Sequence, residues 1–232
     1  MKKLYINCDM GEGISKDAEL LPLVNQANIA CGAHAGSTQI MKSTMQLALE
    51  NNCSLGAHPG YEDPENFGRR SLALANRELE DLLRKQLDDF GNAIEAQDAK
   101  WHHVKPHGGL YHDLASREEQ AELFLELLQD YPVQDVFLKS TEFLKTACEK
   151  RGIRLWSEAF LDRGYDKNGQ LLARGQDGSL LESKEEVAAQ CKRFLKENKA
   201  ETYCVHGDHQ NSVVILTYLH QQLPQWGYQL SP

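Results

Sequence analysis

The sequence predicts an α/β protein whose parallel strands close into a barrel. Seven short apolar runs, partly β-branched or aromatic, alternate with amphipathic stretches of helical length. Strands that alternate with helices are typical of parallel sheets, and seven such units favour a barrel of seven or eight strands over an open sheet. The 232 residues show no linker, fixed-period repeat or low-complexity segment. We therefore expect a single domain spanning residues 1–232.

The expected strands are too short to be helices and are bounded by turn-forming residues. In chain order they are Leu4–Cys8, Ala27–Cys31, Ser54–Ala57, His103–Lys105, Asp135–Lys139, Arg154–Ser157 and Thr202–Val205. Between them, apolar residues recur at helical spacing. The expected helices are 38–52, 76–97, 117–129, 141–151, one after Ser183 and one from Asn211 to near Pro224.

Several of these helices carry recognisable end signals. Ser116-x-x-Glu119 and Ser183-x-x-Glu186 have the pattern of capping boxes. Ser140 is the expected N-cap of the helix that Gly152 ends. The least regular stretch, residues 162–181, contains four glycines, and we expect it to form a functional loop or a small hairpin over the barrel rim.

Composition narrows the classes of partner. Lysine and arginine number 25 against 34 acidic residues, so the net charge of 25 − 34 = −9 argues against nucleic acid or an anionic membrane as the main partner. No apolar run approaches the roughly 20 residues that a transmembrane helix needs. The six cysteines form no C-x-x-C pair, which indicates reduced thiols in a cytoplasmic protein.

Six of the seven expected strands end in a carboxylate, histidine or lysine beside a glycine. In a β/α barrel these ends face one rim, so the side chains are expected to share one pocket. The candidate catalytic residues are Asp9, Glu12, His34, His58, Lys105, His107, Glu158, Asp162, Arg163, His206 and Asp208. The candidate substrate-binding residues are Asn7, Asn28, Arg69 and Tyr111.

Each candidate taken alone could equally have a structural role or simply be exposed to solvent. A strand-end histidine is more often a hydrogen-bonding or surface residue, and glycines after strands commonly just form the turn. Lys105 alone could be solvated, and Gly68-Arg69-Arg70 could be a solvated basic pair rather than an anion clamp. This non-functional explanation becomes less convincing because it would have to hold separately at six strand ends on one face of the barrel.

Such a pocket suits hydrolysis or acyl transfer at a carbonyl. Asp9 and Glu12 could act as base or acid, and Lys105 and Arg163 could stabilise an oxyanion or hold a carboxylate or phosphate. The histidines could move protons or bind metal. Whether a metal is bound stays open; the candidate ligands are Asp9, His34 and His58, and Cys31-x-x-His34 is a weak zinc-like pair.

Several common motifs are missing from the sequence. It contains no H-E-x-x-H zinc motif and no Walker-type phosphate loop. It also lacks a G-x-G-x-x-G dinucleotide fingerprint and a G-x-S-x-G nucleophile elbow.

Taken together, the strand-end motifs resemble those of the LamB/YcsF family, in family order and nearly end to end. The matching segments are 7–13, 27–36, 56–70, 104–111, 158–165 and 204–208. The resemblance implies a distorted seven-stranded, TIM-barrel-like β/α barrel related in fold to polysaccharide deacetylases. It also implies a part in ATP-dependent 5-oxoprolinase, which opens the lactam of 5-oxo-L-proline to L-glutamate. Two partner proteins, subunits B and C, are implied, with ATP and Mg²⁺ bound with or by them.

Two other functions remain open at this point. The runner-up is a stand-alone metal-dependent amidase or deacetylase that uses Asp9, His34 and His58 around Zn²⁺ or a similar ion. The third is a non-catalytic barrel that binds a small acid and regulates an associated complex.

In the leading hypothesis, the 5-oxoprolinase reaction, Asp9 or Glu12 activates water, and His107 protonates the leaving nitrogen.

Overall fold

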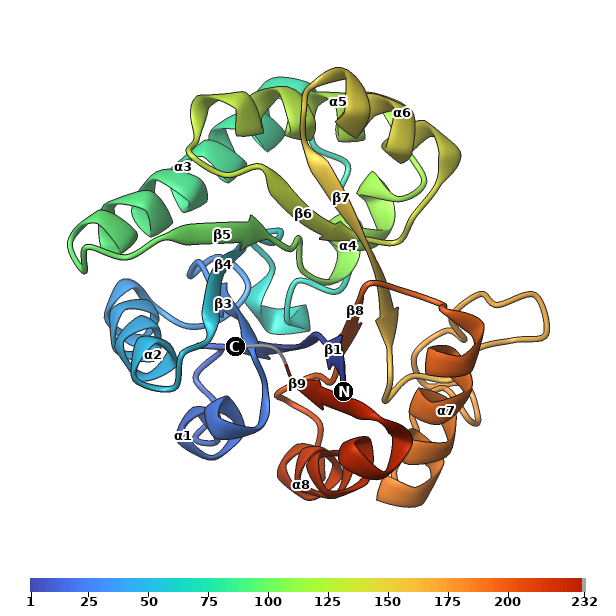
Figure 1. The fold of residues 1–232 in the computed structure, drawn as a ribbon. Helices are drawn as coiled ribbons and strands as arrows, with labels where there is room; N and C mark the ends of the chain where they lie inside the picture. Colours follow the sequence, from blue (N-terminus) through green and yellow to red (C-terminus); the bar gives the residue numbers. More distant parts are fainter. Residues whose placement is uncertain (231–232) are drawn as a thin grey trace.

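The structure, a computed structural model, describes residues 1–230 and shows a closed barrel of seven parallel strands (Figure 1). Their order around the barrel is β2-β3-β4-β5-β6-β7-β8. The strands are β2 (Ile6–Met10), β3 (Gln26–Ala30), β4 (Ser54–His58), β5 (Trp101–Val104), β6 (Asp135–Leu138), β7 (Arg154–Phe160) and β8 (Thr202–Cys204). Each corresponds to one of the seven expected runs, which confirms the predicted barrel.

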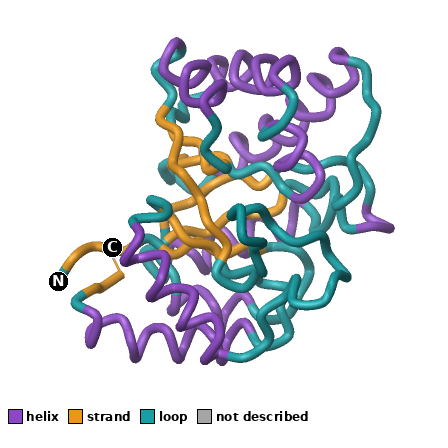
Figure 2. Tube along the Cα trace, turned by 90° about the vertical axis from the view of Figure 1, so that its right-hand side faces the viewer, coloured by secondary structure: helices purple, strands orange, loops and turns teal. Residues whose placement is uncertain are grey.

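Eight helices surround the strands in the described residues (Figure 1). They are α1 (Asp17–Leu20), α2 (Thr38–Glu50), α3 (Asn76–Glu95), α4 (Gly108–Leu114), α5 (Glu118–Leu127), α6 (Glu142–Lys150), α7 (Lys184–Glu197) and α8 (Ser212–Gln222). Figure 2 shows helices above and below the strands, with many of the loops on the side away from the termini. That side holds the rim on which the candidate site residues lie.

Along the strands, side chains point alternately into the apolar core and into the interior of the barrel. On β2, Ile6, Cys8 and Met10 belong to the apolar core, whereas Asn7 and Asp9 between them make polar contacts across the barrel. Successive strand side chains point to opposite faces, so the polar pair points inward and the apolar set packs against the helices. The barrel interior is therefore polar where the site lies.

The helix caps follow the sequence only in part. The Ser183 capping box forms, with Glu186 N donating to Ser183 Oγ at 3.2 Å and Ser183 N donating to Glu186 Oε2 at 3.1 Å. The Ser116 capping box is wrong, because Ser116 Oγ donates to the His112 carbonyl at 2.8 Å, near the end of α4, and Arg117 takes the N-cap position of α5.

The α6 cap is shifted by one residue. Thr141 is the N-cap, and its Oγ1 accepts from Leu144 N at 3.4 Å, so the prediction of Ser140 is wrong. Gly152 follows the helix end with φ of +66°, as its role as terminator requires.

Four short elements were not expected from the sequence. β1 (Lys2–Leu4) and β9 (Tyr228–Leu230) pair in parallel as a separate two-stranded sheet. The expected first strand therefore divides, with Leu4 in β1 and Ile6 in β2. The short helix α1 and the helix α4 were also missed, and α4 begins directly at Gly108 and Gly109.

Residues 162–181, called the strap below, form the expected small hairpin beside the barrel rim. Isolated antiparallel bridges join Arg163 to Leu180 and Tyr165 to Leu171. The Arg163 guanidinium fastens the strap by donating to the carbonyls of Ser179 at 2.9 Å and Leu172 at 2.8 Å.

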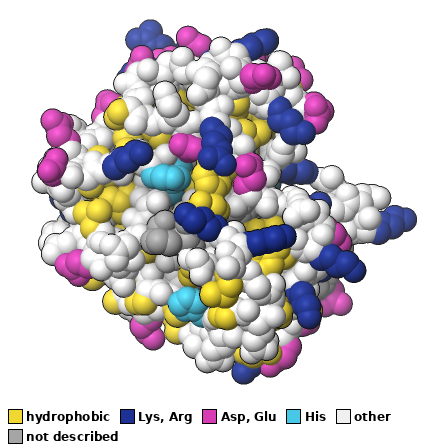
Figure 3. All heavy atoms as spheres, viewed as in Figure 1, with side chains coloured by type: hydrophobic (Ala, Val, Ile, Leu, Met, Phe, Trp, Pro, Cys, Tyr) yellow, Lys and Arg dark blue, Asp and Glu magenta, His cyan; other side chains and the backbone are white. Residues whose placement is uncertain are grey.

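The surface is mixed in charge on the face that carries the termini. Basic and acidic side chains are interspersed around its edge (Figure 3). Within residues 1–230, no helix has the length and apolar character needed to cross a membrane.

Candidate active site

A cavity of about 330 Å³ opens at the carboxyl ends of the barrel strands. Strand-end loops, the start of α4 and the strap supply its walls. Eight of the fifteen candidate residues line it, namely Asp9, His58, Arg69, Lys105, His107, Tyr111, Arg163 and His206. The expected convergence of strand ends on one pocket therefore holds for these residues.

The other seven candidates lie directly behind this lining. Six of them contact a lining residue through a hydrogen bond or an ion pair; they are Asn7, Glu12, Asn28, Glu158, Asp162 and Asp208. The seventh, His34, stacks on the His107 ring with centroids 3.8 Å apart. The structure brings all fifteen together in one cluster.

Lys105 lies at the centre of the cluster, just beyond the end of β5, and is only 2% exposed. Its Nζ lies 2.8 Å from Asp9 Oδ1 and 3.1 Å from Glu158 Oε1. It also lies 3.0 Å from Asn7 Oδ1 and 3.1 Å from Cys204 Sγ. Burial favours the neutral amine, but Asp9, Cys204 and Glu158 together outweigh it and hold the pKa of Lys105 well above its usual value.

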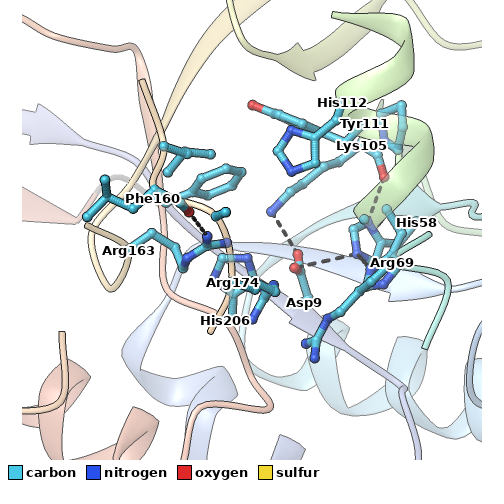
Figure 4. A pocket seen from close by; sticks show the side chains of 16 residues that line it. Asp9, His58, Arg69, Lys105, Tyr111, His112, Phe160, Arg163, Arg174 and His206 are labelled. Atoms are coloured by element: carbon cyan, nitrogen blue, oxygen red, sulfur yellow. Dashed lines mark hydrogen bonds and ion pairs between the residues drawn. The ribbon is translucent and has the colours of Figure 1, made fainter. Parts of the chain in front are cut away.

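Asp9 is held between a cation and an amide. Figure 4 shows the Lys105 amine and the His58 ring converging on the Asp9 carboxylate. Asn28 Nδ2 also donates to Asp9 Oδ1, at 2.8 Å. On the other side of the amide, Asn28 Oδ1 lies 2.8 Å from His103 Nε2. This ring nitrogen carries the proton, because an amide oxygen only accepts.

Asp9 and Glu12 are pushed toward opposite protonation states. Burial alone would raise the pKa of Asp9, but His58 and Lys105 outweigh it and hold that pKa well below its usual value. Burial, reinforced by Asp9 and then Asp208, raises the pKa of Glu12 well above its usual range. Carboxyl groups separated in this way are suited to different acid and base roles.

Three histidines gather around Glu12. Its Oε1 lies 3.4 Å from His34 Nε2, 3.5 Å from His107 Nδ1 and 4.0 Å from His58 Nε2. Burial lowers the pKa of His34 and of His107 well below the usual histidine value, and the neighbouring rings lower both further. All four side chains are at most 8% exposed.

Asp162 and His206 form a second acid–histidine pair at the rim. The buried Asp162 carboxylate accepts from the His206 backbone at 2.9 Å and lies 2.9 Å from His206 Nδ1. Burial opposes ionisation, yet the charge and hydrogen bonds of His206 prevail and lower the pKa of Asp162 to about 2. The His206 ring is thereby fixed in orientation at the pocket wall.

Three arginines make one side of the pocket basic. Arg69, Arg163 and Arg174 all line it (Figure 4). Asp208 forms an ion pair with Arg69. Burial, then the charges of Arg69 and Arg163, lower the pKa of Arg174 to about 10. A pocket whose guanidinium groups depress one another's pKa favours an anionic guest such as a carboxylate or phosphate.

Sequence reasoning missed Arg174, His103 and Cys204. Arg174 stands in the glycine-rich strap, where only Asp162 and Arg163 were expected to be functional residues. His103 and Cys204 sit within strands, where alternation does not reveal whether a residue faces a helix or a polar barrel interior. Their signal exists only in the closed barrel, where His103 reaches Asn28 and Cys204 reaches Lys105.

Comparison with known proteins places this pocket in a family. The model of the LamB/YcsF family matches residues 4–232. The chain belongs to the LamB/YcsF family. This confirms the resemblance of the strand-end motifs, because the match includes every one of them.

Relatives in this family agree over almost their whole length. A protein of Pseudomonas fluorescens that is named as the A subunit of 5-oxoprolinase is 34% identical, covering 96% of this chain and 98% of the relative. One of Pyrococcus horikoshii with the same name is 33% identical over 99% and 97% of the two chains. The crystal structure of a lactam utilization protein from Thermus thermophilus has a TM-score of 0.89 and 30% identity, covering 98% of both chains.

A more distant likeness concerns the fold alone. A family 4 carbohydrate esterase from Streptomyces lividans superposes with a TM-score of 0.53 at 11% identity, covering 100% of this chain and 92% of that protein. The T48 deacetylase gives the same TM-score at 14% identity, over 99% and 87% of the two chains. The expected relation of this LamB/YcsF barrel to the deacetylase fold is confirmed.

Proposed function

We propose that this chain is the A subunit of an ATP-dependent 5-oxoprolinase. In this role it opens the lactam of 5-oxo-L-proline to L-glutamate, coupled to hydrolysis of ATP to ADP and phosphate. The observation that carries the proposal is the full-length match to relatives that bear this name, joined to a buried acid–base cluster at the barrel rim.

The charge pattern of the pocket suits this substrate. 5-Oxoproline carries one carboxylate beside a neutral lactam. The side of the pocket formed by Arg69, Arg163 and Arg174 offers a seat for the carboxylate or for a phosphoryl group. Asp9, Lys105 and His58 line the same cavity, where the lactam carbonyl and nitrogen are to react.

Coupling to ATP answers a chemical difficulty. A planar amide is a poor electrophile, and transfer of the γ-phosphoryl group to its oxygen makes the ring carbon attackable. One water then adds to that carbon, the C–N bond breaks as the nitrogen takes a proton, and a second water releases phosphate. ATP and its Mg²⁺ are assigned to, or shared with, partner subunits B and C.

The contacts suggest how the chain's own residues divide the work. Glu12, with its raised pKa, can give or accept a proton, whereas Asp9 stays ionised. His107 can exchange a proton only through Nδ1, because its Nε2 donates to the Phe67 carbonyl at 2.7 Å. Lys105 is fully occupied by internal partners and acts by holding Asp9 in place, which leaves anion binding to the arginines.

The deciding experiment reconstitutes the complex. ADP and glutamate formed in the presence of 5-oxoproline are measured with this chain alone and with its B and C subunits. We expect turnover only in the complete mixture, and an Asp9→Asn variant that lowers kcat by about 100-fold or more. A complete, folded complex without 5-oxoproline-dependent ADP formation would refute the proposal, as would unchanged turnover in Asp9→Asn, Lys105→Ala and His107→Ala.

The runner-up remains a stand-alone metal-dependent amidase. It predicts ATP-independent amide hydrolysis by this chain without partners. The same assay, run with simple amides and without ATP, separates the two functions.

A further inference from the structure

His58 and His107 face each other in a way that two neutral imidazoles cannot sustain. His58 Nδ1 lies 2.6 Å from the Lys105 carbonyl, and His107 Nε2 lies 2.7 Å from the Phe67 carbonyl. A carbonyl oxygen only accepts, so each of these nitrogens carries the proton of its ring. The remaining nitrogens, His58 Nε2 and His107 Nδ1, are then bare lone pairs, and they lie 2.9 Å apart.

Two lone pairs at this distance repel each other unless a positive charge lies between or beside them. The choices are a proton shared by the rings or a metal ion. A metal ion uses both lone pairs as they are.

Further donors without partners surround the same spot. Within residues 1–230, Glu12 Oε1 and both ring nitrogens of His34 are buried and have no hydrogen-bond partner. Unsatisfied buried polar atoms are costly, and in native proteins they commonly mark an ion or water at the site. When an ion binds, the Glu12 carboxyl loses its proton and then supplies the negative charge that a buried cation needs.

We propose that Glu12, His34, His58 and His107 bind one divalent transition-metal ion. One donor atom from each of the four lies within 4.8 Å of the others. A tetrahedral zinc ion with bonds near 2.1 Å separates its ligands by roughly 3.4 Å. The three ring nitrogens lie 3.4 to 4.0 Å from Glu12 Oε1, and the facing nitrogens of His58 and His107 are 2.9 Å apart. Three imidazoles and a carboxylate suit Zn²⁺, Co²⁺ or Mn²⁺ better than Ca²⁺ or Mg²⁺.

The set differs from the ligands expected from sequence, Asp9, His34 and His58. Asp9 Oδ1 is already taken by Lys105 and Asn28, and only Oδ2 faces His58 Nε2, at 3.5 Å. A second group, Asp9, Cys204 and His206, also gathers donors. There the Lys105 ammonium contacts both Asp9 and Cys204 and repels a cation.

Ion binding does not depend on the proposed function, but a bound ion takes the place of the proton-transfer roles given above to Glu12 and to His107 Nδ1. The further step, that a bound ion assists attack of water on the lactam by lowering the pKa of that water, does rest on it. The chain's four side chains bring the donors together whichever reaction the pocket performs.

Metal binding to the full chain, stripped by a chelator and then titrated with Zn²⁺, Co²⁺ or Mn²⁺, tests the proposal. We expect about one equivalent of ion, a rise in melting temperature with ion concentration, and visible d–d absorption with Co²⁺. His34→Gln and His107→Gln should each weaken the affinity by about tenfold or more. The matched control His220→Gln removes an exposed imidazole from α8 and should bind like wild type.

Three results would overturn the proposal. The first is no stoichiometric binding of any of the three ions by folded wild-type protein. The second is unchanged affinity in both histidine variants; if either fails to fold, Glu12→Gln, which keeps the size of the side chain, decides. The third is a proton shared by His58 and His107, seen by ¹⁵N NMR in excess ion.

The two proposals fail in different ways. Absent ion binding with intact 5-oxoproline turnover in the complex removes only the metal site. Absent turnover with stoichiometric ion binding removes only the assigned reaction.

Discussion

The amine of Lys105 lies between Asp9 and Glu158, two carboxylates that reach into the barrel from β2 and β7. Each charge is tolerated because the other two are present, and the amides of Asn7 and Asn28 occupy further donor and acceptor sites. At the scale of single residues, the pocket depends on such complete networks rather than on individual reactive groups.

Removing the Lys105 charge therefore affects both stability and turnover. Lys105→Met keeps most of the length of the side chain but leaves two buried carboxylates without a countercharge, a loss of about 3–5 kcal/mol in the free energy of unfolding. We expect turnover of the reconstituted complex to fall by about 100-fold or more. Urea unfolding and the ADP assay check this.

The control is Lys150→Met, which removes an exposed lysine at the end of α6. It should leave both quantities within error of wild type. A Lys105→Met protein as stable as this control would show that the buried carboxylates are compensated in another way.

The lowered pKa of the Asp162 carboxyl in the folded protein predicts that stability depends on pH. Its pKa falls from the ordinary 3.8 to about 2 in the folded state, so its stabilising effect is complete above pH 4 and is lost as the pH falls toward 2. The shift corresponds to about 2 kcal/mol. Asp162→Asn should lower the free energy of unfolding by about that amount at pH 7 and converge with wild type near pH 2.

Urea unfolding at a series of pH values measures the difference between the two proteins. The exposed Asp177→Asn provides the control and should follow the wild-type curve throughout. Parallel curves for wild type and Asp162→Asn down to pH 2 would contradict the assigned pairing with His206.

At the scale of elements, local sequence signals explain the seven strands but not four short elements. β1 and β9 are three residues each and pair across the whole chain length, so neither has a local pattern. α4 begins with Gly108 and Gly109, against helix propensity. A Cβ at Gly108 would lie 2.6 Å from the Gly68 carbonyl, and one at Gly109 would lie 2.4 Å from the Arg70 carbonyl. The start of that helix is therefore determined by the close approach of neighbouring backbone in the folded protein and not by helix propensity.

Gly56 offers a similar test within the barrel. A Cβ at this position of β4 would lie 2.1 Å from His103 Nε2, the atom that contacts Asn28. Gly56→Ala should therefore displace the ring, cost about 1–3 kcal/mol of unfolding free energy and lower turnover by disturbing Asn28 and Asp9.

The matched change is Gly91→Ala on α3, where the added Cβ would lie at an ordinary 3.5 Å from Trp101. That variant should be neutral or up to about 1 kcal/mol more stable, because alanine favours a helix interior. Equal urea-unfolding midpoints for the two variants would mean that His103 has room to move.

At the scale of the whole molecule, barrel closure turns strand ends far apart in sequence into one cluster. The strand-end polar residues could be found from sequence because parallel strands place their carboxyl ends on one rim. The sequence could not show which of them line the cavity. Glu158 and Asp162 stand at strand ends, as Lys105 does, yet both lie behind the cavity lining. That division depends on depth within the closed barrel, which no local pattern records.

The strap shows the same dependence on the whole fold. Arg163 lies just beyond β7 and fastens the strap through two carbonyls, while strap residues Leu171 to Arg174 line the cavity. Arg163→Lys keeps the charge but cannot reproduce the two-pronged geometry of the guanidinium. We expect faster limited proteolysis within residues 165–178, a rise in KM for 5-oxoproline of about tenfold, and a melting temperature close to wild type.

Arg154→Lys, at the other end of β7, serves as the control because its ion pair with Glu201 is solvent-exposed at 58% and 46%. It should change neither proteolysis nor KM, since exposed ion pairs contribute little. If Arg163→Lys raised KM without loosening the strap, Arg163 would act through its contact with the substrate alone and not through the strap. Unchanged proteolysis and unchanged KM together would mean that the strap is held by its backbone bridges alone.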